Sequence, residues 1–488
     1  MICITGLDSS LQDLRGRCAR CWAFPLHEIR LDALEESLPS TQALPVHPEK
    51  LIITCRRPSD GGLFEGSETE RLKLLQSAIE GGPGWIDLEA DLSEAAAEPL
   101  LEKARAFGVK ILRSLHLLND QGSGAIRKAL DLLSDAKGDG IKLAARVDDL
   151  KRLETLFHAP RERPAVLIGM GPAGMLSRAL HRRFHSAWTY VSHHPWPDPS
   201  AGIPDLSTAV LFDMPVKDDS KLLVLLGGPS ILVSPGPGTY NRLFRERRFN
   251  GIYLPAVTEC VEDAFRVLDR LGLAGASVTI PHKLRAAELA SNLGESAAAV
   301  QAVNTLYRNR DGRWQGENTD IPAIRAVVER LASKPMKNGV ILGSGGFARA
   351  AAFALNGLGV DSVLLGREVL GARESIEASL PFDNLEQVDF DILVNATPVG
   401  LKPGEDPLCS YDVDFAGKVV LDGVITHSPT TLVTRATAQG AAVAGGLEIW
   451  AEQGARQLEC FEGPGITPDE LVRMAYRSAG PQPAQPLP

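Results

Sequence analysis

The sequence lacks long hydrophobic runs, an excess of positive charge and a leader-like beginning. No apolar run reaches the roughly 20 residues that span a bilayer. Asp and Glu number 61 against 51 Lys and Arg, which gives a formal net charge of -10 at pH 7. Nucleic acids and anionic membranes select a basic face, so we expect neither as a partner. Residues Met1 to Gly6 lack the basic flank and cleavage site of a signal peptide, and we expect a cytoplasmic protein.

Cysteine is also scarce, with seven residues scattered along the chain. Cys18 and Cys21 form the only close pair, and no second pair at ligand spacing accompanies them. Structural zinc sites usually draw on two such pairs, so we expect these thiols to lie on a helix and we assign no metal. An odd number of cysteines in a cytoplasmic chain also argues against structural disulfides.

At 488 residues the chain is too long for one hydrophobic core, and ordinary domain sizes predict roughly three domains. Shifts in composition predict domains at 1–215, 221–330 and 331–478, with a short solvated linker between the first two. The tail 479–488 is rich in Pro and Gln, and we expect it to be disordered.

Short β-rich runs recur through the first two hundred residues, separated mostly by amphipathic stretches such as Glu70 to Ile79, Gly124 to Leu133 and Val147 to Leu156. This α/β alternation predicts a closed (β/α)8 barrel with its active site at the C-terminal ends of the strands. The eight expected strands are Ile2 to Thr5, Leu26 to Leu31, Leu51 to Cys55, Trp85 to Leu88, Lys110 to Leu115, Gly140 to Ala144, Ala165 to Gly169 and Ala187 to Val191.

Charged side chains gather near the ends of the expected barrel strands. Glu28, Arg30 and Asp32 alternate along one strand and so point to the same side, which is costly inside a barrel unless polar partners are present. A lone residue of this kind is more often a salt-bridged or solvated surface residue. Several expected strand ends agree, however, because they also carry Arg56, Asp60, His116 and Arg178.

Lys142 lies in the apolar run Gly-Ile-Lys-Leu-Ala-Ala. An amine that is poorly solvated as an ammonium ion is more readily free to attack a ketone and form a Schiff base. The iminium acidifies the neighbouring carbon, whose proton His116 can take, and the imidazolium can then protonate a departing β-hydroxyl. The pattern predicts a dehydration.

Over roughly Met1 to Val210 the chain resembles type I 3-dehydroquinate dehydratase. The matching pieces are Glu28-Ile-Arg30-Leu-Asp32, Thr54-Cys-Arg56 with Asp60-Gly-Gly, Ser114-Leu-His116, Lys142, and Met170-Gly171 through Ser177-Arg178. The resemblance implies that Lys142 forms the Schiff base and that His116 is the general acid and base. It implies that the substrate is bound by Glu28, Arg30, Arg56, Asp60, Arg178 and Ser200. The family's Ser-Ala-Pro-Gly-Gln lid reads Ser200-Ala-Gly-Ile-Pro204 here, without the glutamine, so we expect weaker lid contacts.

A second set of motifs begins beyond Leu222. Lys283 follows Pro281 in Val-Thr-Ile-Pro-His-Lys, and Asp320 ends an Asn-Thr-Asp turn, so a lysine and a carboxylate can converge on one small polar substrate. Gly343, Gly345 and Ala348 fit G-x-G-x-x-[G/A] between an expected strand and helix, where backbone amides can hold a pyrophosphate. Such a loop alone is a weak signal, but its place after the other motifs favours a dinucleotide-binding (Rossmann) domain.

From about Leu222 to Glu462 the chain resembles shikimate dehydrogenase, which implies an α/β substrate domain followed by a Rossmann domain. Lys283 and Asp320 would form the catalytic pair. The resemblance implies that substrate is held by Ser234, Thr279, Asn304, Asn318 and Gln453, although the asparagines could equally satisfy turn backbone. In the family's Ser-x-Ser-Pro motif the second serine is replaced by Gly236, which removes one donor to the substrate carboxylate or makes room for quinate.

The cofactor residues implied for this half are Gly343, Gly345, Gly346, Arg367, Asn395 and Thr397. Arg367 ends the second expected strand, where an NAD enzyme would place an acidic residue, and its charge favours the 2'-phosphate of NADP. Glu368 beside it leaves some ambiguity.

The two resemblances describe consecutive reactions, because the dehydratase makes the 3-dehydroshikimate that the dehydrogenase reduces. We therefore predict a bifunctional NADPH-dependent enzyme acting on 3-dehydroquinate, 3-dehydroshikimate and shikimate. The alternatives are a quinate-directed dehydrogenase half, a protein with one active half, and, as a different class, a non-catalytic scaffold. The sequence leaves the oligomeric state open.

Overall fold

The computed structural model describes residues 1–38, 40–198, 201–366, 379–381 and 389–478. Ser200, Arg367 and the tail 479–488 lie outside these ranges. The chain divides into two compact units, Met1–Ser220 with Leu254–Gly272, and Lys221–Tyr253 with Leu273–Pro488. Each unit is described separately below.

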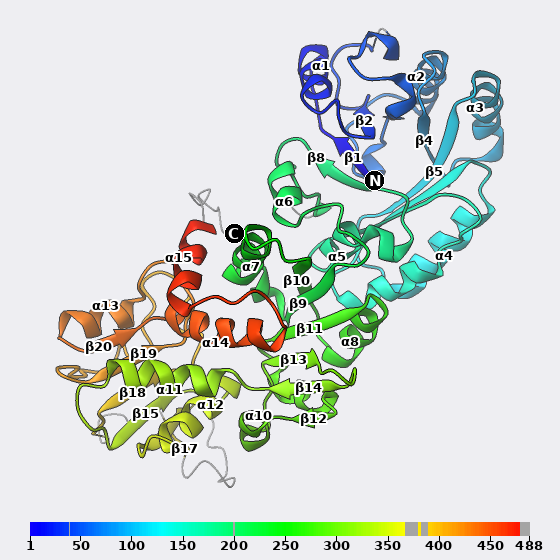
Figure 1. The fold of residues 1–488 in the computed structure, drawn as a ribbon. Coiled ribbons are helices and arrows are strands. Elements are labelled where there is room, and N and C mark those ends of the chain that lie inside the picture. Colours follow the sequence, from blue (N-terminus) through cyan, green and yellow to red (C-terminus); the bar gives the residue numbers. More distant parts are fainter. Residues whose placement is uncertain (39, 199–200, 367–378, 382–388, 479–488) are drawn as a thin grey trace. The chain divides into compact units, whose positions relative to one another are not determined.

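The first unit contains an eight-stranded parallel sheet that curls into a barrel, blue to blue-green in Figure 1. The sheet order is β7-β6-β5-β4-β3-β2-β1-β8, so the first strand pairs with both the second and the eighth. The strands are β1 (Ile2–Thr5), β2 (Leu26–Arg30), β3 (Leu51–Thr54), β4 (Trp85–Glu89), β5 (Lys110–Leu117), β6 (Gly140–Arg146), β7 (Ala165–Met170) and β8 (Thr189–Ser192).

The closure of the predicted barrel is nearly complete in the described strands. Within the described strands no ladder joins β7 to β8. Strand β8 begins only at Thr189, and it is the backbone just before it that meets β7, where the Ala187 N–H donates to the Ala165 carbonyl at 2.8 Å. The predicted (β/α)8 barrel is therefore confirmed.

Helices and short 3-10 turns connect the strands. The first unit has α1 (Leu11–Arg20), α2 (Glu68–Glu80), α3 (Glu94–Phe107), α4 (Gly122–Asp135), α5 (Met175–Ala179) and α6 (Leu206–Leu211), with the 3-10 segments η1 (Thr41–Ala43), η2 (Pro48–Lys50), η3 (Pro58–Asp60), η4 (Leu150–His158) and η5 (His181–Phe184). The amphipathic stretch expected at 147–156 is a 3-10 helix, η4. Its fully buried Leu150, Leu153 and Leu156 recur every third residue, so a helix with three residues per turn stacks them directly above one another.

Strand alternation sorts the barrel residues into two cores. Outward residues such as Ile29, Ile53 and Ile86 pack with the surrounding helices. Inward residues such as Ile52 and Trp85 fill the barrel together with Trp188, whose ring centroid lies 5.5 Å from that of Trp85. The same alternation points polar residues inward beside this apolar plug, and these form the site described below.

The second unit begins with a six-stranded mixed sheet in the order β10-β9-β11-β13-β14-β12, green in Figure 1. Its strands are β9 (Lys221–Gly227), β10 (Gly251–Val257), β11 (Leu273–Val278), β12 (Asn292–Leu293), β13 (Thr305–Arg308) and β14 (Trp314–Glu317). The accompanying helices are η7 (Pro229–Val233), α7 (Pro235–Glu246), α9 (Lys283–Ala286), η8 (Ala287–Leu289) and α10 (Glu295–Val300), while α8 (Val261–Arg270) lies in the segment Leu254–Gly272 that is grouped with the first unit.

A second six-stranded sheet, entirely parallel, follows in the order β17-β16-β15-β18-β19-β20. Numbered from β15, this is the 3-2-1-4-5-6 order of a dinucleotide-binding fold, as the glycine-rich motif predicts. The elements are β15 (Asn338–Leu342), β16 (Asp361–Gly366), β17 (Ser379–Pro381), β18 (Ile392–Asn395), β19 (Val419–Asp422) and β20 (Ala442–Ala444), with α11 (Asp320–Leu331), α12 (Gly346–Asn356), α13 (Thr431–Ala438), α14 (Gly446–Cys460) and α15 (Pro468–Ser478).

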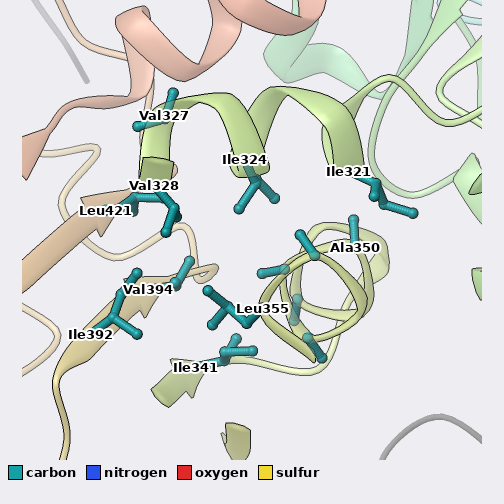
Figure 2. Close-up of a cluster of buried hydrophobic side chains, with 14 of the residues drawn as sticks. Ile321, Ile324, Val327, Val328, Ile341, Ala350, Leu355, Ile392, Val394 and Leu421 are labelled. Atoms are coloured by element: carbon teal, nitrogen blue, oxygen red, sulfur yellow. The ribbon is translucent and has the colours of Figure 1, made fainter. Parts of the chain in front are cut away.

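Helix α11 is anchored in the core of this parallel sheet. Ile321, Ile324 and Val328 lie on one face of the helix and are at most 1% exposed. They pack toward α12 and the sheet, where Figure 2 shows Leu355 and Ile392. Because α11 begins at Asp320, this packing also fixes the position of the Asp320 carboxylate.

Within the described part of the chain, no helix is both long and apolar enough to cross a membrane.

Candidate active sites

The barrel interior holds a buried lysine between two carboxylates. Lys142 Nζ lies 2.8 Å from Asp87 Oδ2 and 3.4 Å from Glu28 Oε1, and it sits 4.5 Å from the centre of the Tyr190 ring. The Lys142 side chain is only 5% exposed. The amine of Lys142 is therefore buried, as the sequence predicts. Its positive charge, however, is compensated by the two carboxylates and the aromatic ring.

The two carboxylates are themselves held by hydroxyl groups. Thr5 and Thr54 donate to Glu28 at 2.6 and 3.1 Å, and Ser114 donates to Asp87. Burial disfavours the charged form of Asp87, yet the charges of Arg56 and Lys142 outweigh burial and hold its pKa far below the usual value. Asp87 is therefore a fixed negative charge beside the amine.

His116 and Arg56 are in direct contact at the same end of the barrel. Arg56 Nη1 lies 2.6 Å from both ring nitrogens of His116, and Arg56 Nη2 donates to Asp87 at 2.7 Å. Burial, followed by the charges of Arg56 and Lys142, lowers the pKa of His116 well below its usual value. A neutral imidazole with a free lone pair can act as a base.

The remaining predicted residues of the barrel have different partners. Arg30 makes a bidentate pair with Asp32, with N···O distances of 2.9 and 2.6 Å. Arg178 is buried and donates to the carbonyls of Gly169 and Ala201 at 3.2 and 2.7 Å. Burial lowers the pKa of Arg178 to about 9. A guanidinium without a carboxylate partner is poised to receive an anion.

Asp60 does not join the cluster around Lys142. It accepts from Arg57 Nε at 2.7 Å, and Arg57 also pairs with Asp91 at 2.9 Å. A cavity of about 400 Å³ in the same unit, between Leu156 and Ala187, is lined by none of the predicted site residues.

The second unit holds another lysine–aspartate pair. Lys283 Nζ lies 2.6 Å from Asp320 Oδ2, where α9 and α11 begin. Asn304 Nδ2 lies 2.9 Å from Asp320 Oδ1, 3.1 Å from Thr319 Oγ1 and 3.3 Å from Gln453 Oε1. This amide fixes the carboxylate from the side opposite the lysine.

Asn318 has a turn-building role. Its side chain donates to the Ala302 carbonyl at 2.9 Å and accepts from the Asp320 backbone N–H at 3.1 Å. Asn318 thus shapes the turn that presents Asp320, which is the backbone role that asparagine often has.

A cavity of about 310 Å³ adjoins the lysine–aspartate pair. Among the described residues of its lining, the charged side chains are Lys283 and Asp320. The predicted substrate residues Ser234, Thr279, Asn304 and Gln453 also line it. Hydroxyl and amide groups around a single ion pair suit a small, highly hydroxylated substrate.

The glycine-rich loop lies where β15 turns into α12, at the reversal of strand order between β15 and β18. Gly343 has φ +112, and a Cβ there would come within 3.1 Å of the Ala396 carbonyl oxygen, so only glycine fits. A Cβ on Gly345 would project into open space at the start of α12. The loop therefore fits a pyrophosphate lying on the helix N-terminus.

Asn395 and Thr397 shape the neighbouring loop. Asn395 is fully buried and donates to Val399 O at 3.1 Å and to Asp422 Oδ1 at 2.9 Å, while its own oxygen accepts from Thr397 Oγ1 at 2.7 Å. Thr397, in contrast, lines the cavity. Of this predicted pair, Thr397 is placed to meet a ligand and Asn395 to hold the turn.

Family models match both units. The type I 3-dehydroquinase model matches residues 2–209, and the shikimate dehydrogenase substrate binding domain model matches residues 226–306. The bifunctional 3-dehydroquinate dehydratase/shikimate dehydrogenase, chloroplastic, of Arabidopsis thaliana is 28% identical over 471 residues, or 90% of this chain and 77% of that protein. The shikimate dehydrogenase (NADP(+)) of Anaeromyxobacter sp. (strain K) is 35% identical over 261 residues, or 50% of this chain and 92% of that protein. The chain belongs to the shikimate dehydrogenase family, and its residues 2–209 match the type I 3-dehydroquinase model.

Among solved structures, the dehydroquinate dehydratase and shikimate dehydrogenase from S. pombe AroM is 23% identical, with a TM-score of 0.42, and covers 97% of this chain and 98% of that chain.

In the dehydroquinase unit, sequence reasoning missed Asp87 and Tyr190, which contact Lys142. The signal for Asp87 is present in Trp-Ile-Asp-Leu-Glu, where alternation turns a carboxylate to the same side as the barrel-filling Trp85. In the dehydrogenase unit it missed Tyr253 and Gln457, which line the cavity. Across the described residues no cluster of three or more potential metal ligands occurs.

Proposed function

We propose that this chain catalyses two consecutive reactions of the shikimate pathway. The dehydroquinase unit dehydrates 3-dehydroquinate to 3-dehydroshikimate, and the dehydrogenase unit reduces 3-dehydroshikimate to shikimate with NADPH. The observation that carries the proposal is the presence of two separate, buried lysine–carboxylate sites, one in each family-matched unit.

In the dehydratase reaction, Lys142 Nζ attacks the ketone carbon, and the carbonyl oxygen leaves as water to give an iminium. His116 removes the proton from the neighbouring carbon and then protonates the departing β-hydroxyl. Water hydrolyses the conjugated iminium, which releases the product and restores the amine. Asp87 and Glu28 stabilise a cationic nitrogen both as ammonium and as iminium, so little reorganisation is needed between the two.

Arg178 is the candidate for binding the substrate carboxylate in this unit, because it is a buried cation that donates to the backbone carbonyls of Gly169 and Ala201. Arg30 has its own carboxylate in Asp32, so we assign it to a substrate hydroxyl. Asp60, engaged by Arg57, would have to exchange that partner before it could reach a ligand.

In the dehydrogenase reaction, Lys283 and Asp320 handle the proton of the reacting oxygen. The Lys283 ammonium is placed to protonate the ketone oxygen during reduction, and Asp320 compensates the lysine's charge. Asn304 holds the carboxylate, and Gln453 adds a second amide at the cavity wall. When bound, NADPH supplies the hydride.

The residues of the glycine-rich loop fit this cofactor. Gly343, Gly345 and Gly346 would hold the pyrophosphate, and Thr397 would meet the nicotinamide side of the cofactor from the cavity. Arg367 remains the proposed ligand of the 2'-phosphate.

A quinate-directed dehydrogenase is the second candidate, and Gly236 favours it. A Cβ at this position would meet its nearest neighbours at 3.4 to 3.8 Å, so the missing side chain leaves room beside Ser234. Thr279 still lines the cavity, and we expect shikimate to remain the better substrate. A higher kcat/KM for quinate in the unmodified protein would reverse this assignment.

Two separate assays test the proposed function. Enone absorbance should appear when the protein is mixed with 3-dehydroquinate alone, and NADPH should be consumed when it is mixed with 3-dehydroshikimate. With 3-dehydroquinate and NADPH together, shikimate should accumulate without any added enzyme. Loss of one signal identifies a protein with one active half, and loss of both identifies a scaffold.

The proposed compartment stays the cytoplasm, as the sequence predicts, and the proposed partners stay the three small acids.

A further inference from the structure

Two hydroxyl-bearing residues that line the dehydrogenase cavity, Ser234 and Tyr253, flank the position of the side chain that Gly236 lacks. A Cβ at residue 236 would lie 3.4 Å from Tyr253 Cε1, 3.8 Å from Tyr253 Oη and 3.5 Å from Ser234 Oγ. The hydroxyl of a serine at 236 would therefore lie beside both of these oxygens. The serine is absent, but the Tyr253 hydroxyl, which comes from strand β10, lies 3.8 Å from the position of its Cβ.

The Tyr253 ring is held rigidly. It is 2% exposed, and its centroid lies 4.7 Å from that of Tyr240, with the ring planes at 75°. Tyr253 also belongs to the cavity lining, together with Ser234 and Ser277. Its hydroxyl group is thus presented at the cavity wall without rotamer freedom.

A buried hydrogen-bond chain leads from Ser277, beside Tyr253, toward the catalytic pair. Burial raises the pKa of the Tyr253 hydroxyl, and the nearby Ser277 side chain offsets part of this rise. Ser277 donates to Gln457 Oε1 at 2.8 Å, and Gln457 Nε2 donates to the Asn304 carbonyl at 2.9 Å. The phenol hydroxyl of Tyr253 carries its own proton and can donate it to a ligand. A hydroxyl proton can rotate, and a carboxylate is a stronger acceptor than a serine oxygen.

The start of α7 offers an anion few other donors. Ser234 caps the helix, and both Pro235 and Pro237 lack an N–H. The Gly236 N–H already bonds with Ser234 Oγ at 3.3 Å. A carboxylate bound here depends on side-chain hydroxyls, since the only cation of the lining, Lys283, is paired with Asp320.

We propose that Tyr253 is a specificity-determining residue whose hydroxyl donates to the substrate carboxylate, beside Ser234, in place of the missing serine at 236. This inference rests on the proposed reduction of 3-dehydroshikimate, and it names the group that makes that binding possible in spite of Gly236.

Tyr253→Phe removes only the oxygen, and it should be compared with Tyr240→Phe. The Tyr240 hydroxyl is buried without a hydrogen-bond partner, so its removal should change neither kinetic constant. For Tyr253→Phe we expect the KM for shikimate to rise about tenfold with kcat changed less than about twofold, because a hydrogen bond to a charged acceptor is lost. With the methyl ester of shikimate, which has no anionic oxygen, KM should differ less than about twofold between Tyr253→Phe and unmodified protein.

Gly236→Ser supplies the second arm of the test. In the Tyr253→Phe background it should restore most of the lost affinity, whereas in the unmodified protein it should improve KM less than about threefold. The inference would be overturned by an equal rise in KM for the acid and the ester, or by a KM that Gly236→Ser does not restore in the Tyr253→Phe background. A tenfold lower KM in Gly236→Ser alone would also overturn it. This last result is decisive even if Tyr253→Phe does not fold. An unmodified protein that does not oxidise shikimate at all would instead refute the proposed function.

Discussion

Each unit of this chain buries a lysine against an aspartate, but the two lysines are held differently. Lys142 lies within a strand, 5% exposed, between two carboxylates and beside an aromatic ring. Lys283 lies at the start of a short helix, 12% exposed, with one carboxylate and a cavity before it. The first environment suits a nitrogen that carries positive charge through a covalent sequence. The second suits a nitrogen that passes a proton to a ligand and takes it back.

The comparison shows that a lysine–aspartate pair does not define a reaction by itself. In the dehydroquinase unit the further partner of the lysine is Glu28, an acid fixed by two threonines, so the charge of the amine is compensated twice. In the dehydrogenase unit the further partner of the aspartate is Asn304, so it is the carboxylate rather than the amine that is held in place. The role of each lysine therefore follows from whether one carboxylate or two surround its amine.

The largest effect that would test this comparison is expected for Lys142→Ala. We expect dehydration to fall by more than about a thousandfold, because the covalent step is lost, while the dehydrogenase stays intact. The exposed Lys137→Ala serves as the matched control, since its side chain is 63% exposed. Borohydride added during turnover should attach one substrate mass to the peptide containing Lys142. Labelling elsewhere would contradict the Schiff-base assignment.

The reciprocal change is Lys283→Met. We expect the kcat of shikimate oxidation to fall about a hundredfold to ten-thousandfold, because a positioned proton donor and acceptor contributes that much. Dehydration should be unaffected. Lys334→Met, at an exposed position, is the control. A dehydratase loss in Lys283→Met would show that the two units do not work independently.

Cofactor choice should show a smaller effect. NADPH is expected to be preferred to NADH at least about tenfold, and Arg367→Ala should remove most of that preference, because a charge-assisted contact is worth roughly 1.5 to 3 kcal/mol. The measurement is kcat/KM for both cofactors in both proteins. Equal use of the two cofactors by the unmodified protein would refute the role of Arg367.

The smallest expected effect is a displacement of the dehydratase pH profile. Burial, Arg56 and Lys142 lower the pKa of His116, so the neutral base persists below its usual range and activity is lost only when the pH falls further. Arg56→Gln removes one of these cations, so the pKa rises and the acid limb of kcat/KM should move to higher pH. Arg57→Gln, whose parent side chain pairs with Asp60 and Asp91, should leave the limb in place. An unmoved limb in Arg56→Gln would argue that another group controls it.

Alternation and turn chemistry explain why much of the architecture can be predicted from the sequence. The expected strand at Ile2 to Thr5 coincides with β1, and the other expected barrel strands differ from the observed ones by one or two residues, at a single end for β2 to β7 and at both ends for β8. One element differs in type, because the expected amphipathic α-helix is the 3-10 helix η4. Leucines at every third residue fit both kinds of helix over a short window. Incomplete closure depends on where β8 begins, which no local pattern encodes.

Site residues were harder to predict where their partners are distant in sequence. Asp87 lies 55 positions from Lys142, and a single acid in an apolar strand gives no sign of which cation it will meet. Tyr253 resembles any other core aromatic in Gly-Ile-Tyr-Leu-Pro, and only the space beside Gly236 distinguishes it. Asp60 was predicted as a site residue from its motif position alone. The motif gave no sign that the neighbouring Arg57 would pair with the Asp60 carboxylate.

The anchoring of α11 ties the chemistry of one sheet to the packing of another. Lys283 follows the mixed sheet, whereas Asp320 begins a helix whose apolar face is buried in the parallel sheet (Figure 2). The 2.6 Å ion pair between them therefore connects two layers of the dehydrogenase unit. The packing of both layers therefore sets the distance between the ammonium and the carboxylate that hold the reacting proton.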